Sequence, residues 1–186
     1  MNNELLTGDL IRLTAEDPQI YAETFSRWGR DSEYTRLLDN DPARMPSITK
    51  TKEWFEKFSE KEQVNETFFL VRSLEGNTLI GFVGLFGIEW NHGDAWVGIG
   101  IGDRQYWGKG YGTDAMRVIL RYAFTELNLH RITLGVFEYN SRAIRSYEKA
   151  GFIIEGRFRQ QLHREGRHWD EIMMGILRQE WMENEK

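Results

Sequence analysis

Three glycines occupy alternate positions in residues 105–112, QYWGKGYG, between a strand-like run and a helix-like run. The first amides of a helix have no partner inside it, and together with the positive end of the helix dipole they form an anion site. A glycine backbone can come within hydrogen-bonding distance of a phosphate, because no side chain stands in the way. The segment therefore predicts a phosphate-binding turn.

Two common phosphate loops do not fit this segment. The nucleoside-triphosphate loop needs a glycine five residues before the Gly-Lys-Ser/Thr group, whereas Gly102 lies six residues before Gly108 and Gly110 replaces the Ser or Thr. The dinucleotide-binding fingerprint needs a third glycine, and Thr113 stands there instead. The spacing argues against a nucleotide-binding kinase or reductase.

The strand-like run before the glycine turn alternates between apolar and small residues. The apolar positions are Ala95, Val97, Ile99 and Ile101, and the alternate positions are Trp96, Gly98, Gly100 and Gly102. A strand sends alternate side chains to opposite faces, so one face here is nearly bare backbone. The small residues on this face have two possible explanations. Either a ligand approaches the backbone closely, or a helix packs tightly against the sheet.

The elements around the turn form a strand-helix-strand unit. Apolar residues at helical spacing from Met116 to Leu127 predict a helix, and residues 132–136 predict a strand. Such a unit implies parallel or near-parallel pairing of its strands. Asn140 is expected to cap a short helix that Gly151 ends.

The rest of the chain predicts a mixed α/β domain. We expect strands at 10–14, 67–72, 78–89, 152–162 and 169–176, a hairpin turn at 165–166, a helix from Asp17-Pro18 with Ile20, Thr24, Phe25 and Trp28 on one face, and a helix with Trp54, Phe55 and Phe58 on one side. Residues 30–47, with the acidic cluster 39–41, are expected to be irregular.

Composition excludes several classes of protein. The 186 residues carry a net charge of -5 and include no cysteine, which excludes disulfides, thiolate zinc sites and a cysteine nucleophile. The start of the sequence lacks the pattern of a signal peptide, and no apolar run approaches the ~20 residues of a membrane helix. We expect one cytoplasmic domain over 1–186, without a metal, a nucleic-acid partner or a membrane partner.

Two motifs resemble signatures of the GNAT acetyltransferase superfamily. Gln105-x-x-Gly108-x-Gly110 resembles its pyrophosphate loop, [QR]-x-x-G-x-[GA], and residues 140–152, NSRAIRSYEKAGF, resemble its second signature, N-x-x-A-x-x-x-Y-x-x-x-G-F. Residues 10–17 resemble the family's opening strand, and residues 163–177 resemble the final hairpin of the branch that acetylates ribosomal-protein N-termini and, in relatives, polyamines. The resemblance implies a splayed, mostly antiparallel sheet of about seven strands with helices on both faces. It also implies acetyl-CoA as donor and a primary amine as acceptor, either a protein N-terminus or a small polyamine, and a homodimer is one possible assembly.

The resemblance also implies roles for individual residues. The pantetheine arm would be held by backbone groups of Ile99, Gly100 and Ile101, and the diphosphate by the amides of Tyr106, Trp107, Gly108, Lys109, Gly110, Tyr111 and Gly112. Asn140 would contact the cosubstrate, and Tyr147 would protonate the departing thiolate. From the residues alone, Asn140 could simply cap its helix, and Tyr147 could simply be a core residue. The side chains of Trp107 and Lys109 could be ordinary surface residues, and for Trp107 we favour this interpretation.

The general base and the acceptor are less well marked. Many relatives carry Glu two residues before the glycine of the central strand, where this chain has Trp96. Glu89, His92 and Asp94 lie near Trp96 in the sequence and are candidates for the general base. A chain of water molecules that carries the proton away is the alternative. Residues 30–47 and 163–169 would border the acceptor groove, where Asp39 and Asp41 could attract an ammonium group. A non-catalytic CoA-binding domain remains the second hypothesis.

Overall fold

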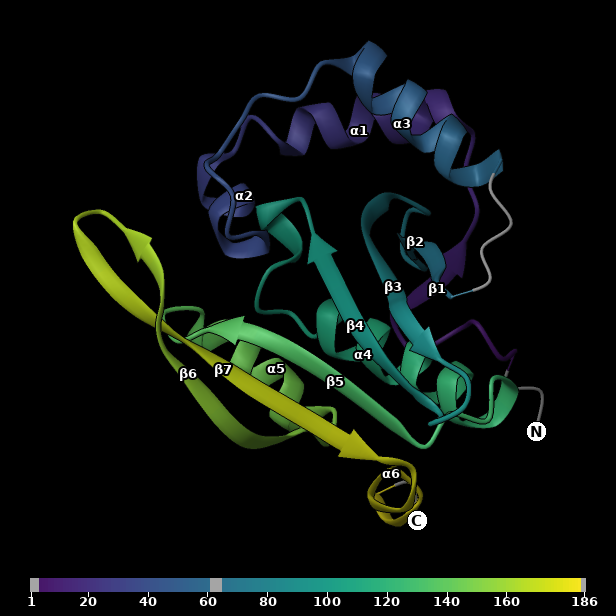
Figure 1. The fold of residues 1–186 in the computed structure, drawn as a ribbon. Coiled ribbons are helices and arrows are strands. Elements are labelled where there is room, and N and C mark those ends of the chain that lie inside the picture. Colours follow the sequence, from purple (N-terminus) through teal and green to yellow (C-terminus); the bar gives the residue numbers. More distant parts are fainter. Residues whose placement is uncertain (1–3, 61–64, 185–186) are drawn as a thin grey trace.

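The computed structural model describes residues 4–60 and 65–184, without the side chains of 58–60, and centres on a seven-stranded sheet (Figure 1). The elements in chain order are β1 (Ile11–Thr14), α1 (Pro18–Trp28), α2 (Ser32–Leu38), α3 (Ile48–Glu60), β2 (Thr67–Ser73), β3 (Leu79–Glu89), β4 (Asp94–Ile101), the 3-10 turn η1 (Arg104–Tyr106), α4 (Tyr111–Arg121), the π-helical turn η2 (Tyr122–Glu126), β5 (Arg131–Phe137), α5 (Ser141–Lys149), β6 (Ile153–Arg164), β7 (Arg167–Leu177) and α6 (Arg178–Asn184). The strand order is β1-β2-β3-β4-β5-β7-β6. Neighbouring strands are antiparallel except for the parallel pair β4–β5, which confirms the expected fold class.

The sheet opens between its two central strands. β4 and β5 pair only where Asp94–Trp96 faces Arg131–Thr133. Beyond this point β4 stays bonded to β3, while β5 stays bonded to β7 (Figure 1). Residues 97–101 of β4 therefore have no strand partner on the side of β5, and the splay expected from the family resemblance is present.

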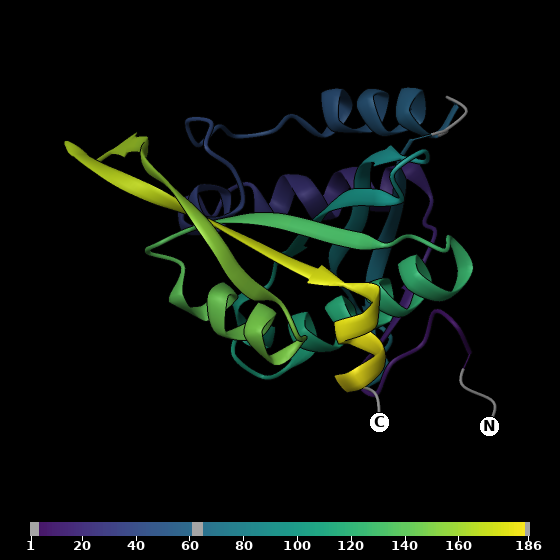
Figure 2. The ribbon, with the colours of Figure 1, turned by 60° about the horizontal axis from the view of Figure 1, so that its bottom comes forward.

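Helices cover both faces of the sheet, with α1 and α3 on one face and α4 and α5 on the other (Figure 1, Figure 2). The core on the α4 side is mainly aliphatic and includes Met116, Ile119 and Ile132. The core on the α1 side is mainly aromatic, and the rings of Tyr21 and Phe55 stack with their centroids 3.9 Å apart. Both cores anchor β4, which lies between them.

The nearly bare face of β4 is explained by packing. A Cβ atom added at Gly100 would lie 2.5 Å from a ring carbon of Phe82, and one added at Gly102 would lie 1.9 Å from the ring of Trp28. Aromatic side chains from β3 and α1 thus take the space that side chains on these glycines would need. Packing therefore accounts for the small residues on this face, and the packed neighbours include a strand as well as a helix. The backbone of Gly98 and Gly100 also lines a cavity, so the approach of a ligand stays a prediction.

One expected loop contains a helix. Residues 30–47 include α2, whose N-cap Asp31 accepts hydrogen bonds from the amides of Glu33 and Tyr34 at 3.0 and 3.4 Å. A capping Asp followed by Glu in the first turn is a helix-start signal. At seven residues the helix is too short for its apolar spacing to be evident, so the expectation of a wholly irregular segment was wrong.

Other departures concern which side chains face inward. On α1 the buried positions include Tyr21 and Ala22, whereas Ile20 is 43% exposed. On β6, Ile154 and Phe158 are each 52% exposed, because bulges beside them break the expected alternation.

On α3, Phe55 is buried while Trp54 is half exposed, and the side chain of Phe58 lies outside the described residues.

No described helix has the length and apolar character needed to cross a membrane.

Candidate active site

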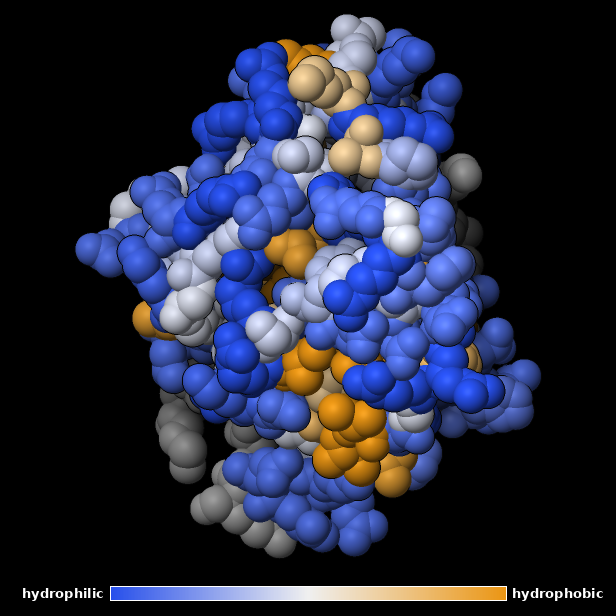
Figure 3. Space-filling view, turned by 90° about the vertical axis from the view of Figure 1, so that its left-hand side faces the viewer, coloured by the Kyte–Doolittle hydropathy of each residue, from blue (hydrophilic) through white to orange (hydrophobic). Residues whose placement is uncertain are grey.

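A cavity of about 900 Å³ lies where β4 and β5 separate. Its walls are β4 from 97 to 101, the glycine turn, the first two turns of α4, one side of α5 along its length, the end of β5 and the end of α2. Seen from the side on which the β6–β7 hairpin projects, the surface is hollowed near its centre, with apolar residues inside and hydrophilic residues around the rim (Figure 3). Both sequence signatures therefore meet at one cavity.

The glycine turn presents unpaired amides to this cavity. Gly108 and Gly110 have φ angles of +71° and +94°, a region that other residues rarely adopt. No heavy atom lies within 4 Å of a Cβ built on Gly108. The first helical hydrogen bond of α4 runs from the amide of Asp114 to the carbonyl of Gly110 at 2.9 Å. The amides of 108–113, which precede it, donate no hydrogen bond within the described chain. The turn has the geometry of an anion site.

Asp114 fixes this turn against the start of β1, a role that sequence reasoning missed. Its buried carboxylate accepts hydrogen bonds from the amides of Asp9, Leu10 and Ile11 at 3.2, 2.7 and 3.1 Å. An acidic residue in the first turn of a helix was visible in the sequence. Its hydrogen-bond partners lie more than 100 positions away in the sequence, so the sequence did not reveal which residues they are.

Basic side chains line the cavity beside the glycine turn. They are Arg117 on α4 and Arg142, Arg145 and Lys149 on α5. Within the described chain none of the four forms an ion pair with a carboxylate. These cations and the unpaired amides suit the phosphates of a nucleotide-like ligand.

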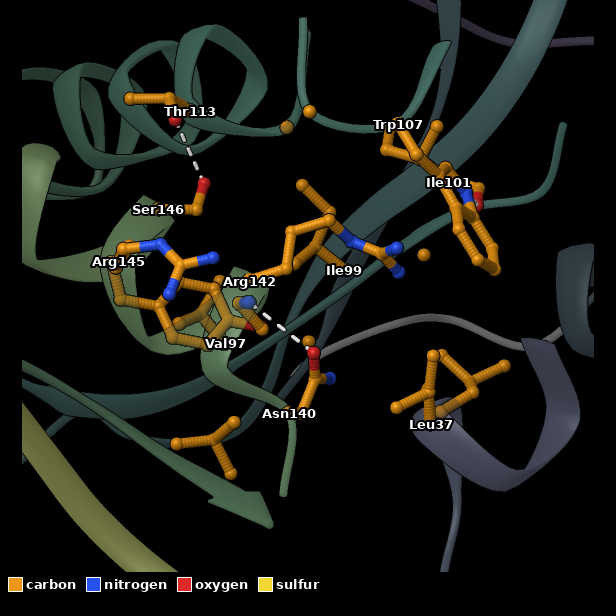
Figure 4. Close-up of a pocket in the computed structure, with 18 of the residues that line it drawn as sticks. Leu37, Val97, Ile99, Ile101, Trp107, Thr113, Asn140, Arg142, Arg145 and Ser146 are labelled. Atoms are coloured by element: carbon orange, nitrogen blue, oxygen red, sulfur yellow. Dashed lines mark hydrogen bonds between the residues drawn. The ribbon is translucent and has the colours of Figure 1, made fainter. Parts of the chain in front are cut away.

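Trp107 is part of the cavity wall. Its indole Nε1 donates to the carbonyl of Ile101 at 2.6 Å, and the Arg142 guanidinium lies 3.7 Å from the ring centroid (Figure 4). Partial burial lowers the pKa of Arg142, chiefly through desolvation. The interpretation of Trp107 as a simple surface residue was therefore wrong, whereas Lys109 is exposed. The Ile101 carbonyl is already bonded, which leaves the backbone of Ile99 and Gly100 as the freer part of this edge.

Asn140 and Tyr147, both from the second signature, line the cavity from α5. The Asn140 side-chain oxygen accepts from the amide of Ala143 at 3.2 Å (Figure 4), so this residue caps the helix as well. The Tyr147 ring packs against the core, near Phe152. Burial raises the pKa of Tyr147 to about 12, so its phenol carries its proton at neutral pH.

Tyr34 on α2 is a second phenol in the cavity wall that sequence reasoning did not find. The hydroxyl is buried without a hydrogen-bond partner in the described chain, and a Cβ on Gly100 would lie 2.9 Å from it. Burial strongly raises the pKa of Tyr34. The hydroxyl reaches β4 from the α1 face, opposite to the face on which α5 lies.

The end of the cavity away from the glycine turn carries acidic and amide groups. Asp39 and Asn40 follow α2, and Glu171 on β7 lies across from Phe137 of β5. Neither Asp39 nor Glu171 forms an ion pair within the described residues. This end of the cavity suits a cationic group.

The base candidates taken from sequence proximity lie outside the cavity. Glu89, His92 and Asp94 are at the β3–β4 turn, and Trp96 is 49% exposed on β4. His163 and His168 face each other across the β6–β7 hairpin, with ring centroids 4.6 Å apart. In the part of the chain that is described, no group of His, Asp and Glu side chains is arranged to hold a metal ion.

Comparison with known proteins agrees with this geometry. The family model for the acetyltransferase (GNAT) domain matches residues 10–153. The spermidine N(1)-acetyltransferase of Vibrio cholerae is 34% identical over 141 residues, which is 69% of this chain and 80% of that protein. The SPbeta prophage-derived N-acetyltransferase YokL of Bacillus subtilis is 29% identical over 176 residues, 94% of each chain.

A solved structure supports the same assignment. The crystal structure of spermidine N-acetyltransferase from Vibrio cholerae in complex with CoA and spermine has a TM-score of 0.81 and 27% identity, and the match covers 92% of this chain and 98% of that chain. The glycine turn, its neighbouring cations and the edge of β4 fit a CoA thioester. With more than three quarters of the sequence matched by the family model and the fold matched almost throughout, the chain belongs to the GNAT family and is an acetyl-CoA-dependent N-acetyltransferase.

Proposed function

We propose that the acceptor is a small polyamine of the spermidine class. The observation that carries this proposal is the division of charge in one cavity. Cations without a carboxylate partner lie beside the glycine turn, and the unpaired carboxylates of Asp39 and Glu171 lie at the other end. The first end matches an anionic cosubstrate and the second a cationic acceptor. Relatives that act on spermidine support this assignment.

Each end of the cavity also supplies proton chemistry. Acetyl-CoA provides a thioester that an uncharged amine can attack. Tyr147, protonated at neutral pH, donates its proton to the departing sulfur. Glu171, which lines the cavity and has no cation partner in the described chain, accepts the proton that the amine must lose, directly or through water. It takes the role that Glu on β4 has in many relatives, where this chain has Trp96.

A panel of acceptors tests the proposal. Purified protein with acetyl-CoA is incubated with spermidine, spermine, or peptides that carry free N-termini, and both thiol release and the mass of the acetylated product are measured. We expect a gain of one acetyl group on a polyamine, with kcat/KM at least tenfold above that of any peptide. Preferred acetylation of a peptide N-terminus would overturn the choice of acceptor. Binding of acetyl-CoA without transfer to any amine would favour the CoA-binding domain instead.

A further inference from the structure

One guanidinium at the tip of the β6–β7 hairpin holds the segment that follows α2. Arg164 Nη2 donates to the carbonyls of Asp39, Asn40 and Asp41 at 3.1, 3.3 and 3.2 Å. Its Nη1 donates to the carbonyl of Arg36 and, at 2.7 Å, to the hydroxyl of Tyr139. A single side chain thus gathers four backbone carbonyls, all within residues 36–41.

One of these carbonyls, that of Arg36, belongs to the last turn of α2, and the other three follow the helix. Helix α2 ends at Leu38, and the last carbonyls of a helix lack intrahelical partners and carry the negative end of its dipole. No other described side chain donates to the carbonyls of 39–41. Arg164 therefore caps α2 through the Arg36 carbonyl and also holds the segment that follows the helix, from a part of the chain more than 120 positions away.

Further contacts fix both sides of this link. The Tyr139 hydroxyl also donates to the Arg36 carbonyl at 2.9 Å, and the Tyr139 ring packs edge-on against Trp169. The Arg36 side chain pairs with Glu165 at 2.6 Å. The Arg164 guanidinium also lies 5.8 Å from the ring centroid of Phe137 on β5. The hairpin, the end of β5 and α2 are joined at one place.

The link determines how charge is presented to the cavity. Asp39 and Asn40 line its acceptor end. Arg164 contacts the backbone of this segment and forms no ion pair with a described carboxylate. Among the described residues, the Asp39 carboxylate accepts a hydrogen bond only from the amide of Asp41, at 3.1 Å, which leaves it free to meet a cation.

We propose that Arg164 is a positioning residue for the acceptor: it holds residues 36–41 as a wall of the acceptor end and acts through that segment. The proposal rests on the proposed function, because it concerns where the amine substrate binds. Lysine cannot replace the guanidinium, since an ammonium group is a point charge and lacks the planar fork that spans several carbonyls. A change at Arg164 should therefore affect the acceptor and spare acetyl-CoA.

The experiment compares Arg164→Lys and Arg164→Gln with the matched control Arg167→Gln. Arg167 is on the same hairpin, but neither it nor any other residue of 163–169 lines the cavity, contrary to the expectation from the sequence. Its guanidinium stacks on Trp169 at 3.8 Å and has no hydrogen bond or ion pair with residues 36–41. Steady-state kinetics gives KM for spermidine and for acetyl-CoA, and hydrogen exchange followed by mass spectrometry reports on peptides covering 36–41. We expect both Arg164 variants to raise spermidine KM at least fivefold, to keep acetyl-CoA KM within twofold, and to speed exchange in 36–41 at least tenfold. The control should match wild type.

The outcomes separate this proposal from the proposed function. If the variants acetylate spermidine with unchanged KM, the positioning role is wrong while the polyamine activity stands. A parallel rise in acetyl-CoA KM, or unchanged exchange in 36–41, would also overturn it. A wild type that acetylates no amine would overturn the proposed function and this inference with it. If Arg164→Gln does not fold, Arg164→Lys, which keeps the charge, decides by the same two measurements.

Discussion

At the scale of the single residue, Tyr147 belongs both to the core and to the cavity wall. Its ring packs in the core beside Phe152, while its position on the cavity wall leaves the phenol available to a ligand. Sequence spacing alone favoured a core residue, and the family signature favoured a proton donor. The structure is compatible with both, because a phenol can bury its ring and present its hydroxyl. Only kinetics separates the two roles.

Tyr147→Phe should lower kcat about 100-fold and leave acetyl-CoA affinity within twofold. General-acid help is typically worth about 10²–10⁴ in rate, and a thiol with a pKa near 8.5 needs only the lower part of that range. Phenylalanine keeps the buried ring, so packing should survive. Initial rates with spermidine and calorimetric titration of acetyl-CoA check both values. Tyr122→Phe is the control, because Tyr122 packs on Phe69 outside the cavity. A kcat within threefold of wild type would leave Tyr147 with a packing role only.

The residues that sequence reasoning found and missed differ in how far away their partners lie. Gly108, Gly110 and Asn140 act through backbone conformation or near neighbours, so a local pattern predicts them. Tyr34 and Arg164 act through contacts with distant segments. No local spacing encodes such a contact, because its partner is determined only when the sheet brings the segments together.

The turn between β4 and α4 shows the same distinction at the scale of elements. Its position and its helix were predicted, because a glycine run between two periodic segments is a local signal. The short helix α2 and the bulges of β6 were missed, since seven residues or a single inserted residue leave too little periodicity to detect. The packing of aromatic rings onto the glycines of β4 was left open, because it depends on α1 and β3.

Gly108→Ala should weaken acetyl-CoA binding at least threefold, about 0.7 kcal/mol. The added methyl group would point into the open space of the turn, and a φ angle of +71° is unfavourable for alanine. Gly166→Ala is a matched control, because Gly166 has a φ angle of +67°, has no heavy atom within 4 Å of a Cβ, and lies in the β6–β7 turn. Both variants should lose similar stability in urea, about 1 kcal/mol. Equal acetyl-CoA affinities in calorimetry would contradict the assignment of the glycine turn.

The N-cap of α2 predicts a pH dependence of stability. Hydrogen bonding to Arg104, at 2.7 Å, is the main cause that lowers the pKa of Asp31 to about 2. A depressed pKa in the folded state means that Asp31 contributes stability above its unfolded pKa, about 3.9, and that this contribution is lost as pH falls toward 2. Asp31→Asn keeps a capping side chain and removes the charge. The difference in unfolding free energy between wild type and Asp31→Asn should therefore be largest near neutral pH and shrink between about pH 4 and 2. Urea titrations at several pH values check this, and a difference that grows on acidification would contradict it.

Charge is arranged locally at the scale of the whole molecule. The chain carries a net charge of -5, yet its main cavity has cations at one end and carboxylates at the other. Net charge from composition excluded a general nucleic-acid surface but could not show this division. It arises because α4 and α5 supply the basic residues of the cavity, while the segment after α2 and Glu171 on β7 supply the carboxylates. The open sheet is what gives one cavity two chemically different ends.

The most direct measurement of the central claim is a paired kinetic comparison of the two ends. The double variant Asp39→Asn/Glu171→Gln removes charge at the acceptor end, and Arg145→Gln/Lys149→Gln removes charge beside the glycine turn. Steady-state rates give KM for spermidine and for acetyl-CoA in each variant. We expect the first variant to raise spermidine KM at least tenfold with acetyl-CoA KM within twofold, and the second to raise acetyl-CoA KM at least fivefold with spermidine KM within twofold. Variants that change both constants together, or neither, would contradict the claim that the two substrates bind at opposite ends of this cavity.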